Sequence, residues 1–182
     1  MEHKDYTLEI VGELLREKGH ARAIAKNLKT NHMTINRKIK ELLDKNVLDL
    51  KEEGRNKSYY LKKTIEAKRY VYMYEHYKLL EFLKKHPDMK RLIKEIQDDK
   101  RFRIAMIFGS YAKGLEKKES DIDLYIGTED SKVKKDLEKL DNRINMKIGK
   151  YNKENLLIKE IEKDHIIIKG VEEYYERNKI FD

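Results

Sequence analysis

Apolar residues recur at helical spacing through the first quarter of the chain. The pattern begins at Leu8 and stops at Lys18 and Gly19, which predicts one helix, and residues 21–28 and 33–45 repeat the same period. The third of these helices is expected to bury its apolar positions, Met33, Ile35, Ile39, Leu42 and Leu43. The chain therefore opens with three short helices.

After residue 45, an alternating pattern of apolar and polar residues replaces the helical spacing. Residues 47–50 and 58–61 predict two strands joined by a turn at 52–57, which is a β-hairpin. Residues 64–86 predict a long helix with a tyrosine-rich stripe, formed by Tyr70, Met73, Tyr74, Tyr77 and Leu80. Such a stripe can stack bases, but we expect it to be buried between domains or between the two subunits of a homodimer.

The second half of the chain mixes helices and strands. Residues 88–98 and 131–140 predict helices, and apolar strands are expected around Phe102–Phe108, Asp121–Ile126 and Arg143–Ile148. We take His165 as a packing or capping residue. The expected fold is α+β with three parts, which are a DNA-binding domain at 1–63, a linker or dimerisation helix at 64–87, and an α/β domain with a small mixed sheet at 88–182.

Composition and charge narrow the class of function. Cysteine is absent among the 182 residues, which excludes disulfides and cysteine-based zinc sites, and the apolar runs are far shorter than a membrane span needs. We therefore expect a cytoplasmic protein with no membrane partner. Residues 1–63 hold 15 Lys and Arg against 10 Asp and Glu, which is +5 of the net charge of +8. This excess predicts an anionic partner at the N-terminal end.

Three helices followed by a hairpin with a Gly-Arg-Asn-Lys tip resemble the winged helix-turn-helix domain of bacterial and archaeal regulators over residues 5–63. The resemblance implies that the third helix enters the major groove of duplex DNA and that the hairpin tip contacts the backbone or the minor groove. The matching positions here are Thr34, Asn36, Arg37, Lys38, Arg55 and Lys57. The other interpretation is a dimerisation or protein-docking module.

The main candidate catalytic and ligand-binding residues lie between residues 102 and 126. Gly109 and Ser110 form a turn between a strand and a short helix, where backbone amides and a hydroxyl can bind phosphate oxygens. Asp121 and Asp123 alternate along the next strand, so both carboxylates project from one face. Paired acids beside a phosphate-binding turn suit Mg²⁺, which takes hard oxygen ligands and substrate phosphates.

The run Gly109-Ser110-Tyr111-Ala112-Lys113-Gly114, followed by Ser120-Asp121-Ile122-Asp123-Leu124, resembles the signature of the minimal nucleotidyltransferases of the DNA polymerase β superfamily. The resemblance implies catalytic, metal-binding aspartates at 121 and 123, and nucleotide contacts at Gly109, Ser110 and Ser120. It also implies a nucleoside triphosphate as donor, Mg²⁺ or Mn²⁺ as cofactor, and an unknown acceptor hydroxyl. Minimal family members often act as antitoxins, which makes a partner toxin protein one expected partner. We expect the fusion to be archaeal.

The chain departs from that family at the third carboxylate, which the family carries on a following strand. On residues 143–148 we expect Lys147 at that place, where an ammonium group would neutralise the aspartates without a metal. Glu129, Asp130 and Asp141 are weaker substitutes for the missing acid. The alternative function is therefore a DNA-binding transcriptional regulator whose catalytically inactive domain senses nucleotide or dimerises.

Overall fold

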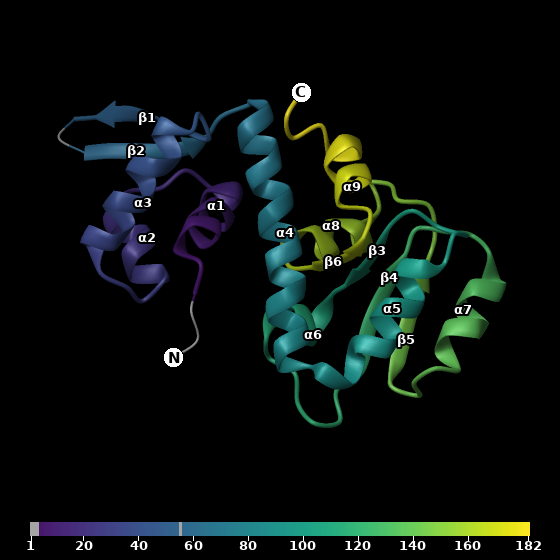
Figure 1. Ribbon diagram of the computed structural model, residues 1–182. Coiled ribbons are helices and arrows are strands. Elements are labelled where there is room, and N and C mark those ends of the chain that lie inside the picture. Colours follow the sequence, from purple (N-terminus) through teal and green to yellow (C-terminus); the bar gives the residue numbers. More distant parts are fainter. Residues whose placement is uncertain (1–3, 55) are drawn as a thin grey trace. The chain divides into compact units, whose positions relative to one another are not determined.

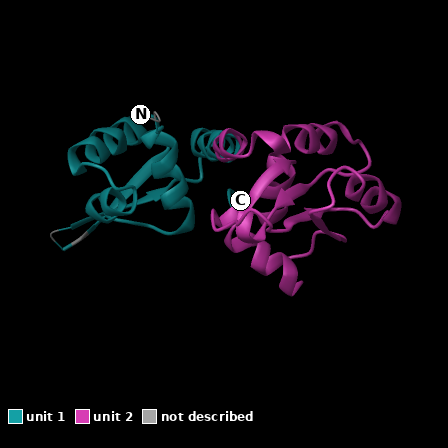
Figure 2. Ribbon diagram, turned by 90° about the horizontal axis from the view of Figure 1, so that it is seen from below, with its two compact units in different colours: residues 1–77, 180–182 teal, residues 78–179 magenta. Residues whose placement is uncertain are grey.

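The computed structural model describes residues 4–54 and 56–182. The chain divides into two compact units, residues 1–77 with 180–182 and residues 78–179 (Figure 2). The division falls inside one helix, α4 (Ile65–Lys85), so the expected linker helix contributes to both units. Within the described residues, no helix is long and apolar enough to cross a membrane.

The first unit contains three helices and a two-stranded hairpin (Figure 1). Their bounds are α1 (Tyr6–Arg16), α2 (Ala21–Asn27), α3 (His32–Asp44), β1 (Leu48–Glu53) and β2 (Asn56–Leu61). The side chains of Asp5 and Asn31 cap α1 and α3, because each accepts hydrogen bonds from free backbone amides of the first turn. An isolated bridge between Gly19 and Tyr59 adds a third strand position to the hairpin. This arrangement is the expected winged helix.

One expected core residue of α3 lies outside the core. Ile35, Ile39 and Leu42 are buried as predicted, but the Met33 residue is 77% exposed. Met33 precedes Ile35 by two positions, which is about 200° around a helix, so it projects from the opposite face. The prediction that Met33 is buried was therefore wrong.

The tyrosines of the α4 stripe contact the first unit itself, whereas Met73 and Leu80 of the stripe are exposed rather than buried as predicted. The Tyr74 ring lies against Gly12 of α1, where an added Cβ would come within 2.2 Å of the ring. Tyr77 donates its hydroxyl proton to Glu9, and Lys45, the residue that follows α3, donates to the Tyr70 hydroxyl at 3.1 Å. These contacts attach the first half of α4 to α1 and α3. The expectation of a dimer through this helix stays a prediction.

The second unit is built on a four-stranded mixed sheet in the order β5-β4-β3-β6. Strands β4 and β5 pair in parallel, and the other neighbours pair antiparallel. After α4 the elements are η1 (Pro87–Met89), α5 (Lys90–Asp98), β3 (Ala105–Ile107), α6 (Gly109–Lys113), β4 (Ile122–Ile126), α7 (Ser131–Glu138), β5 (Ile144–Ile148), α8 (Leu156–Lys163), β6 (Ile166–Lys169) and α9 (Val171–Asn178). The α+β class and the small mixed sheet are confirmed.

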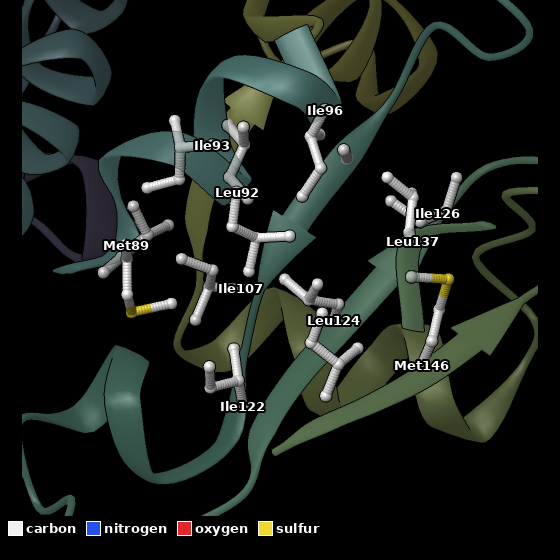
Figure 3. Packing of buried hydrophobic residues seen from close by; sticks show 14 of the residues in the cluster. Met89, Leu92, Ile93, Ile96, Ile107, Ile122, Leu124, Ile126, Leu137 and Met146 are labelled. Atoms are coloured by element: carbon white, nitrogen blue, oxygen red, sulfur yellow. The ribbon is translucent and has the colours of Figure 1, made fainter. Parts of the chain in front are cut away.

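One face of this sheet forms the main core of the unit. Side chains of the central strands pack against α5 and α7, with Leu124 and Ile107 facing Leu92 and Ile96 (Figure 3). Successive side chains of a strand point to opposite faces, so Asp123, between Ile122 and Leu124, points away from this core. The core thereby directs the candidate chemistry to the other face of the sheet.

Candidate active site

Asp123 and Gly109 come together because β3 and β4 are hydrogen-bonded neighbours. The Phe108 amide donates to the Asp123 carbonyl at 3.0 Å, which brings the turn after β3 alongside Asp123. Gly109 has a φ of +69°, and a Cβ on it would lie 2.2 Å from Oδ2 of Asp123. A side chain at position 109 would therefore displace the carboxylate, so glycine is required here for both reasons.

Asn145 occupies the position that faces Asp123 on the following strand. The two residues pair in register across β4 and β5, and the Asn145 amide donates from Nδ2 to Oδ1 of Asp123 at 2.8 Å. Each residue is half-buried. The place of a third carboxylate is thus filled by a neutral amide.

Lys147 does not take that place. It pairs in register with Tyr125 and is exposed, and no ion pair joins it to Asp121 or Asp123 in the described part of the chain. The expectation that Lys147 replaces the third acid was wrong. The parallel register sets Asn145 opposite Asp123, and Lys147 lies two residues further along β5.

The three substitute acids are engaged elsewhere. Asp141 accepts from the Arg143 backbone amide and from its guanidinium, with an Arg143 Nη2 to Asp141 Oδ2 distance of 2.7 Å, and this hydrogen bonding lowers the pKa of Asp141. Asp130 caps α7 by accepting from the Lys132 amide, and Glu129 forms an ion pair with Lys150 at 3.2 Å. Each of these acids already has a structural partner.

The remaining predicted site residues are Asp121, Ser110 and Ser120. Asp121 is exposed immediately before β4, where the strand period directs it to the same side as Asp123. Ser110 lies in the first turn of α6 and is half-buried. The Ser120 hydroxyl oxygen accepts from the Lys117 amide at 2.8 Å, so this side chain closes the loop that leads to Asp121.

Tyr125 is the next side chain after Asp123 on the same face of β4. It is 2% exposed and donates its hydroxyl proton to the Gly149 carbonyl at 2.9 Å. Burial raises the pKa of Tyr125 to about 12. The phenol therefore stays neutral near neutral pH and supports the site as a packing residue.

The donor set suits a hard divalent cation. Asp121 and Asp123 supply carboxylate oxygens, and the Asn145 side chain carries an amide oxygen of the kind that such cations accept. In the described residues, no group of three or more His, Asp or Glu side chains is placed to hold a metal ion. The protein alone thus offers two carboxylates, and substrate phosphates would have to complete the coordination.

The predicted DNA-binding residues lie on α3 and the hairpin. Asn36 and Arg37 are exposed, Thr34 is half-buried, and Lys57 is exposed on β2. The Lys38 ammonium pairs with Glu41 at 2.8 Å, which leaves it less free for a phosphate. Arg55 lies outside the described residues.

Two further exposed residues lie on this face, Lys40, which was not among the predicted DNA-binding residues, and Met33, which was predicted to be buried. Both stand with Arg37 on the exposed side of α3, away from Ile35 and Ile39. A helical wheel centred on those two isoleucines would have found them. Asn145 was missed for a different reason, because the register of β4 and β5 decides which residue faces Asp123.

Comparison with known proteins finds a family match within the second unit. Residues 90–174 match the family model described as polymerase beta, nucleotidyltransferase, which confirms the resemblance seen in the Gly-Ser and Asp-Xaa-Asp motifs. None of the curated proteins matches the chain.

Solved structures provide two distant likenesses. The adhesin competence repressor AdcR from Streptococcus pyogenes is 16% identical with a TM-score of 0.41, over 50% of this chain and 68% of that one. The homodimeric winged helix-turn-helix DNA-binding domain Mb0332 from Mycobacterium bovis, described as a possible ArsR-family transcriptional regulator, is 14% identical with a TM-score of 0.35, over 46% and 74%. Both are too distant to support a functional conclusion.

Proposed function

We propose that this protein binds a nucleoside triphosphate with Mg²⁺ at Asp121 and Asp123, transfers its nucleotidyl group to an acceptor hydroxyl, and binds duplex DNA through the winged helix. The observation that carries the proposal is the packing of the Asp123 carboxylate against Gly109 within a matched nucleotidyltransferase domain. That contact sets a carboxylate beside the turn that would receive phosphates.

The residues of the site have separate roles. Asp121 and Asp123 would hold Mg²⁺ or Mn²⁺, and such an ion supplies charge stabilisation for the phosphates during transfer. The Gly109 backbone leaves room for a phosphate, and Ser110 offers a hydroxyl beside it. Asn145 fixes Asp123 through its 2.8 Å hydrogen bond. An amide cannot accept a proton from the acceptor, so Asn145 cannot act as a general base.

A nucleotide-responsive DNA-binding regulator without transferase activity is the second candidate. The neutral Asn145 amide in place of an acid favours it, because the chain then lacks a base on β5 to activate the acceptor. Both candidates require nucleotide binding, and they differ only in turnover. A fold alone does not decide between them.

The winged helix supports DNA binding through its charge. Arg37 and Lys40 are exposed on α3, and Lys57 adds a further positive charge on the hairpin. Cations placed on a helix and a wing can neutralise phosphates on both sides of a groove. A homodimer and a toxin partner belong to the proposal as expected assemblies, and the first would match a two-fold symmetric DNA site.

The test of transfer is release of pyrophosphate. The purified protein is incubated with each of the four ribonucleoside triphosphates and Mg²⁺ or Mn²⁺, with and without duplex DNA or cell extract as a source of acceptor. The proposal expects release by the wild-type protein and none by Asp123→Asn. Nucleotide binding without release under every condition would select the regulator, and absence of nucleotide binding would reject both candidates.

A further inference from the structure

An ion pair at the C-terminal end of α4 joins two segments that are distant in sequence. His86 follows the last residue of α4, and its Nε2 atom lies 3.2 Å from Oε1 of Glu116 in the loop between α6 and β4. The side chains are only 16% and 21% exposed. Figure 1 shows this loop beside the C-terminal end of α4. The pair is thus much less screened than the surface ion pairs of the unit.

Aromatic contacts hold the histidine in place. The His86 ring packs on Phe82 at a centroid distance of 4.6 Å and meets the edge of Tyr111 at 5.2 Å. Tyr111 directly follows Ser110 of the phosphate-binding turn. His86 therefore contacts both the helix that bears Ser110 and the loop that leads to Asp121.

Glu116 depends on this histidine. Its second oxygen, Oε2, is buried and accepts no hydrogen bond from the described residues. A buried carboxylate with one unpaired oxygen is costly, so its one partner contributes strongly to keeping the side chain inside. Without His86, the Glu116 carboxylate would gain more from returning to water than from staying in place.

We propose that His86 and Glu116 are positioning residues of the nucleotide site, which fix the loop of residues 114–121 and with it Ser120 and Asp121. The loop begins at Gly114 in the left-handed region and closes on the hydrogen bonds between Lys117 and Ser120. The His86 contact is its anchor to the body of the unit. The proposal rests on the proposed function, because it assigns a role in nucleotide binding.

Hydrogen exchange tests the anchor without any ligand. In Glu116→Gln the backbone amides of Lys117 and Ser120 should exchange several-fold faster than in the wild-type protein at pH 6. Glu138→Gln, which removes the exposed ion pair between Lys134 and Glu138 on α7, is the matched control and should leave these amides unchanged. Equal exchange in Glu116→Gln and wild type would overturn the proposal.

A double-mutant cycle then tests the role in binding. The dissociation constant for ATP with Mg²⁺ is measured for wild type, His86→Gln, Glu116→Gln and the double variant. We expect each single variant to bind several-fold more weakly than wild type, with losses that are not additive in the double variant. Additive effects, or equal affinity in all four proteins, would overturn the positioning role while the proposed function stands. Faster loop exchange in Glu116→Gln, together with no nucleotide binding by the wild-type protein, would reject the proposed function instead and leave the anchor in place.

Discussion

Three residues from three consecutive parts of the sheet define the candidate site. Asp123 is held from two sides, by the backbone of Gly109 near Oδ2 and by the Asn145 amide at Oδ1. The carboxylate is therefore oriented before any ligand arrives, which reduces the ordering cost of binding. The same two contacts make the site sensitive to small changes at either neighbour.

Gly109→Ala should damage the site more than its stability cost alone explains. The substitution places a methyl group in the left-handed region, at a cost of about 1–2 kcal/mol of unfolding free energy, and pushes it against Asp123. Gly114→Ala is the matched control, because Gly114 has a φ of +65° and open space around its Cβ position. Chemical denaturation and nucleotide titration of both variants should show similar destabilisation but loss of binding in Gly109→Ala only. Retained binding in Gly109→Ala would contradict the geometry.

Asn145→Asp should convert the site into a three-carboxylate metal site. The variant loses the hydrogen bond to Asp123 and gains a like charge opposite it, so the free energy of unfolding should fall without metal and recover with Mn²⁺. Calorimetry should show Mn²⁺ binding at least about tenfold tighter than in wild type, from ligand charge alone. Lys147→Asp is the control, since Lys147 pairs with Tyr125 rather than with an aspartate, and equal increases in Mn²⁺ affinity in both variants would contradict the assigned register.

Some residues of the candidate site could be predicted from the sequence, and others could not. Gly109, Asp121 and Asp123 follow from spacing, since a glycine turn and alternating acids carry their chemistry locally. The position of Asn145 opposite Asp123 could not be predicted from the sequence. Parallel strands are joined through a separate helix, so no turn fixes which residues of β4 and β5 face each other. Only the folded sheet shows which residue of β5 faces Asp123.

Helices α1 and α4 contact each other at Gly12, where the Tyr74 ring fills the space a side chain would need. Burial also raises the pKa of Tyr74, so this ring stays neutral in the contact. The absence of a Cβ at position 12 therefore lets the first half of α4 lie against the winged helix. This contact gives a physical use to one tyrosine of the dense α4 stripe.

The effect of Gly12→Ala on the free energy of unfolding should change sign with the residue at position 74. In the wild-type background the new Cβ overlaps the Tyr74 ring, so the free energy of unfolding should fall by about 1–3 kcal/mol. In a Tyr74→Ala background the same change should stabilise by up to about 1 kcal/mol, because alanine is the better helix former. Gly19→Ala, with its nearest atom at 3.6 Å, is the control and should change little. Destabilisation by Gly12→Ala in both backgrounds would contradict this contact.

Elements were predictable where periodicity ran long or caps were clear. The helices of the winged helix and α4 lie close to their expected bounds, and the structure shows Asp5 and Asn31 as caps that were not predicted. The elements after β5 had no prediction, because α8 and α9 are eight residues each and β6 is four, which is too short for a distinct period. β6 is held in place by its antiparallel pairing with β3, a contact between residues distant in sequence.

At the scale of the whole chain, the excess of positive charge near the N-terminus should affect the affinity for duplex DNA and its dependence on salt. Arg37→Gln with Lys40→Gln should weaken binding to duplex DNA and lower the slope of log affinity against log salt by about 0.9 for each phosphate that the protein no longer neutralises. Lys38→Gln should have less effect, because Glu41 already pairs with Lys38. Fluorescence anisotropy over a salt series measures both quantities. An equal loss of affinity in Lys38→Gln would show that the pair opens on DNA, and an unchanged double variant would exclude α3 as the DNA-binding face.

The central claim is that the two aspartates and the Gly109 turn form a metal-dependent nucleotide site, and calorimetric titration tests it most directly. A non-hydrolysable nucleoside triphosphate analogue is titrated into wild type, Asp121→Asn and Asp123→Asn, with Mg²⁺ and with EDTA. We predict one site per chain in the wild-type protein with Mg²⁺, and a loss of affinity of about tenfold or more in EDTA and in either variant. Equal affinity in all these titrations, or no binding by the wild-type protein, would contradict the account.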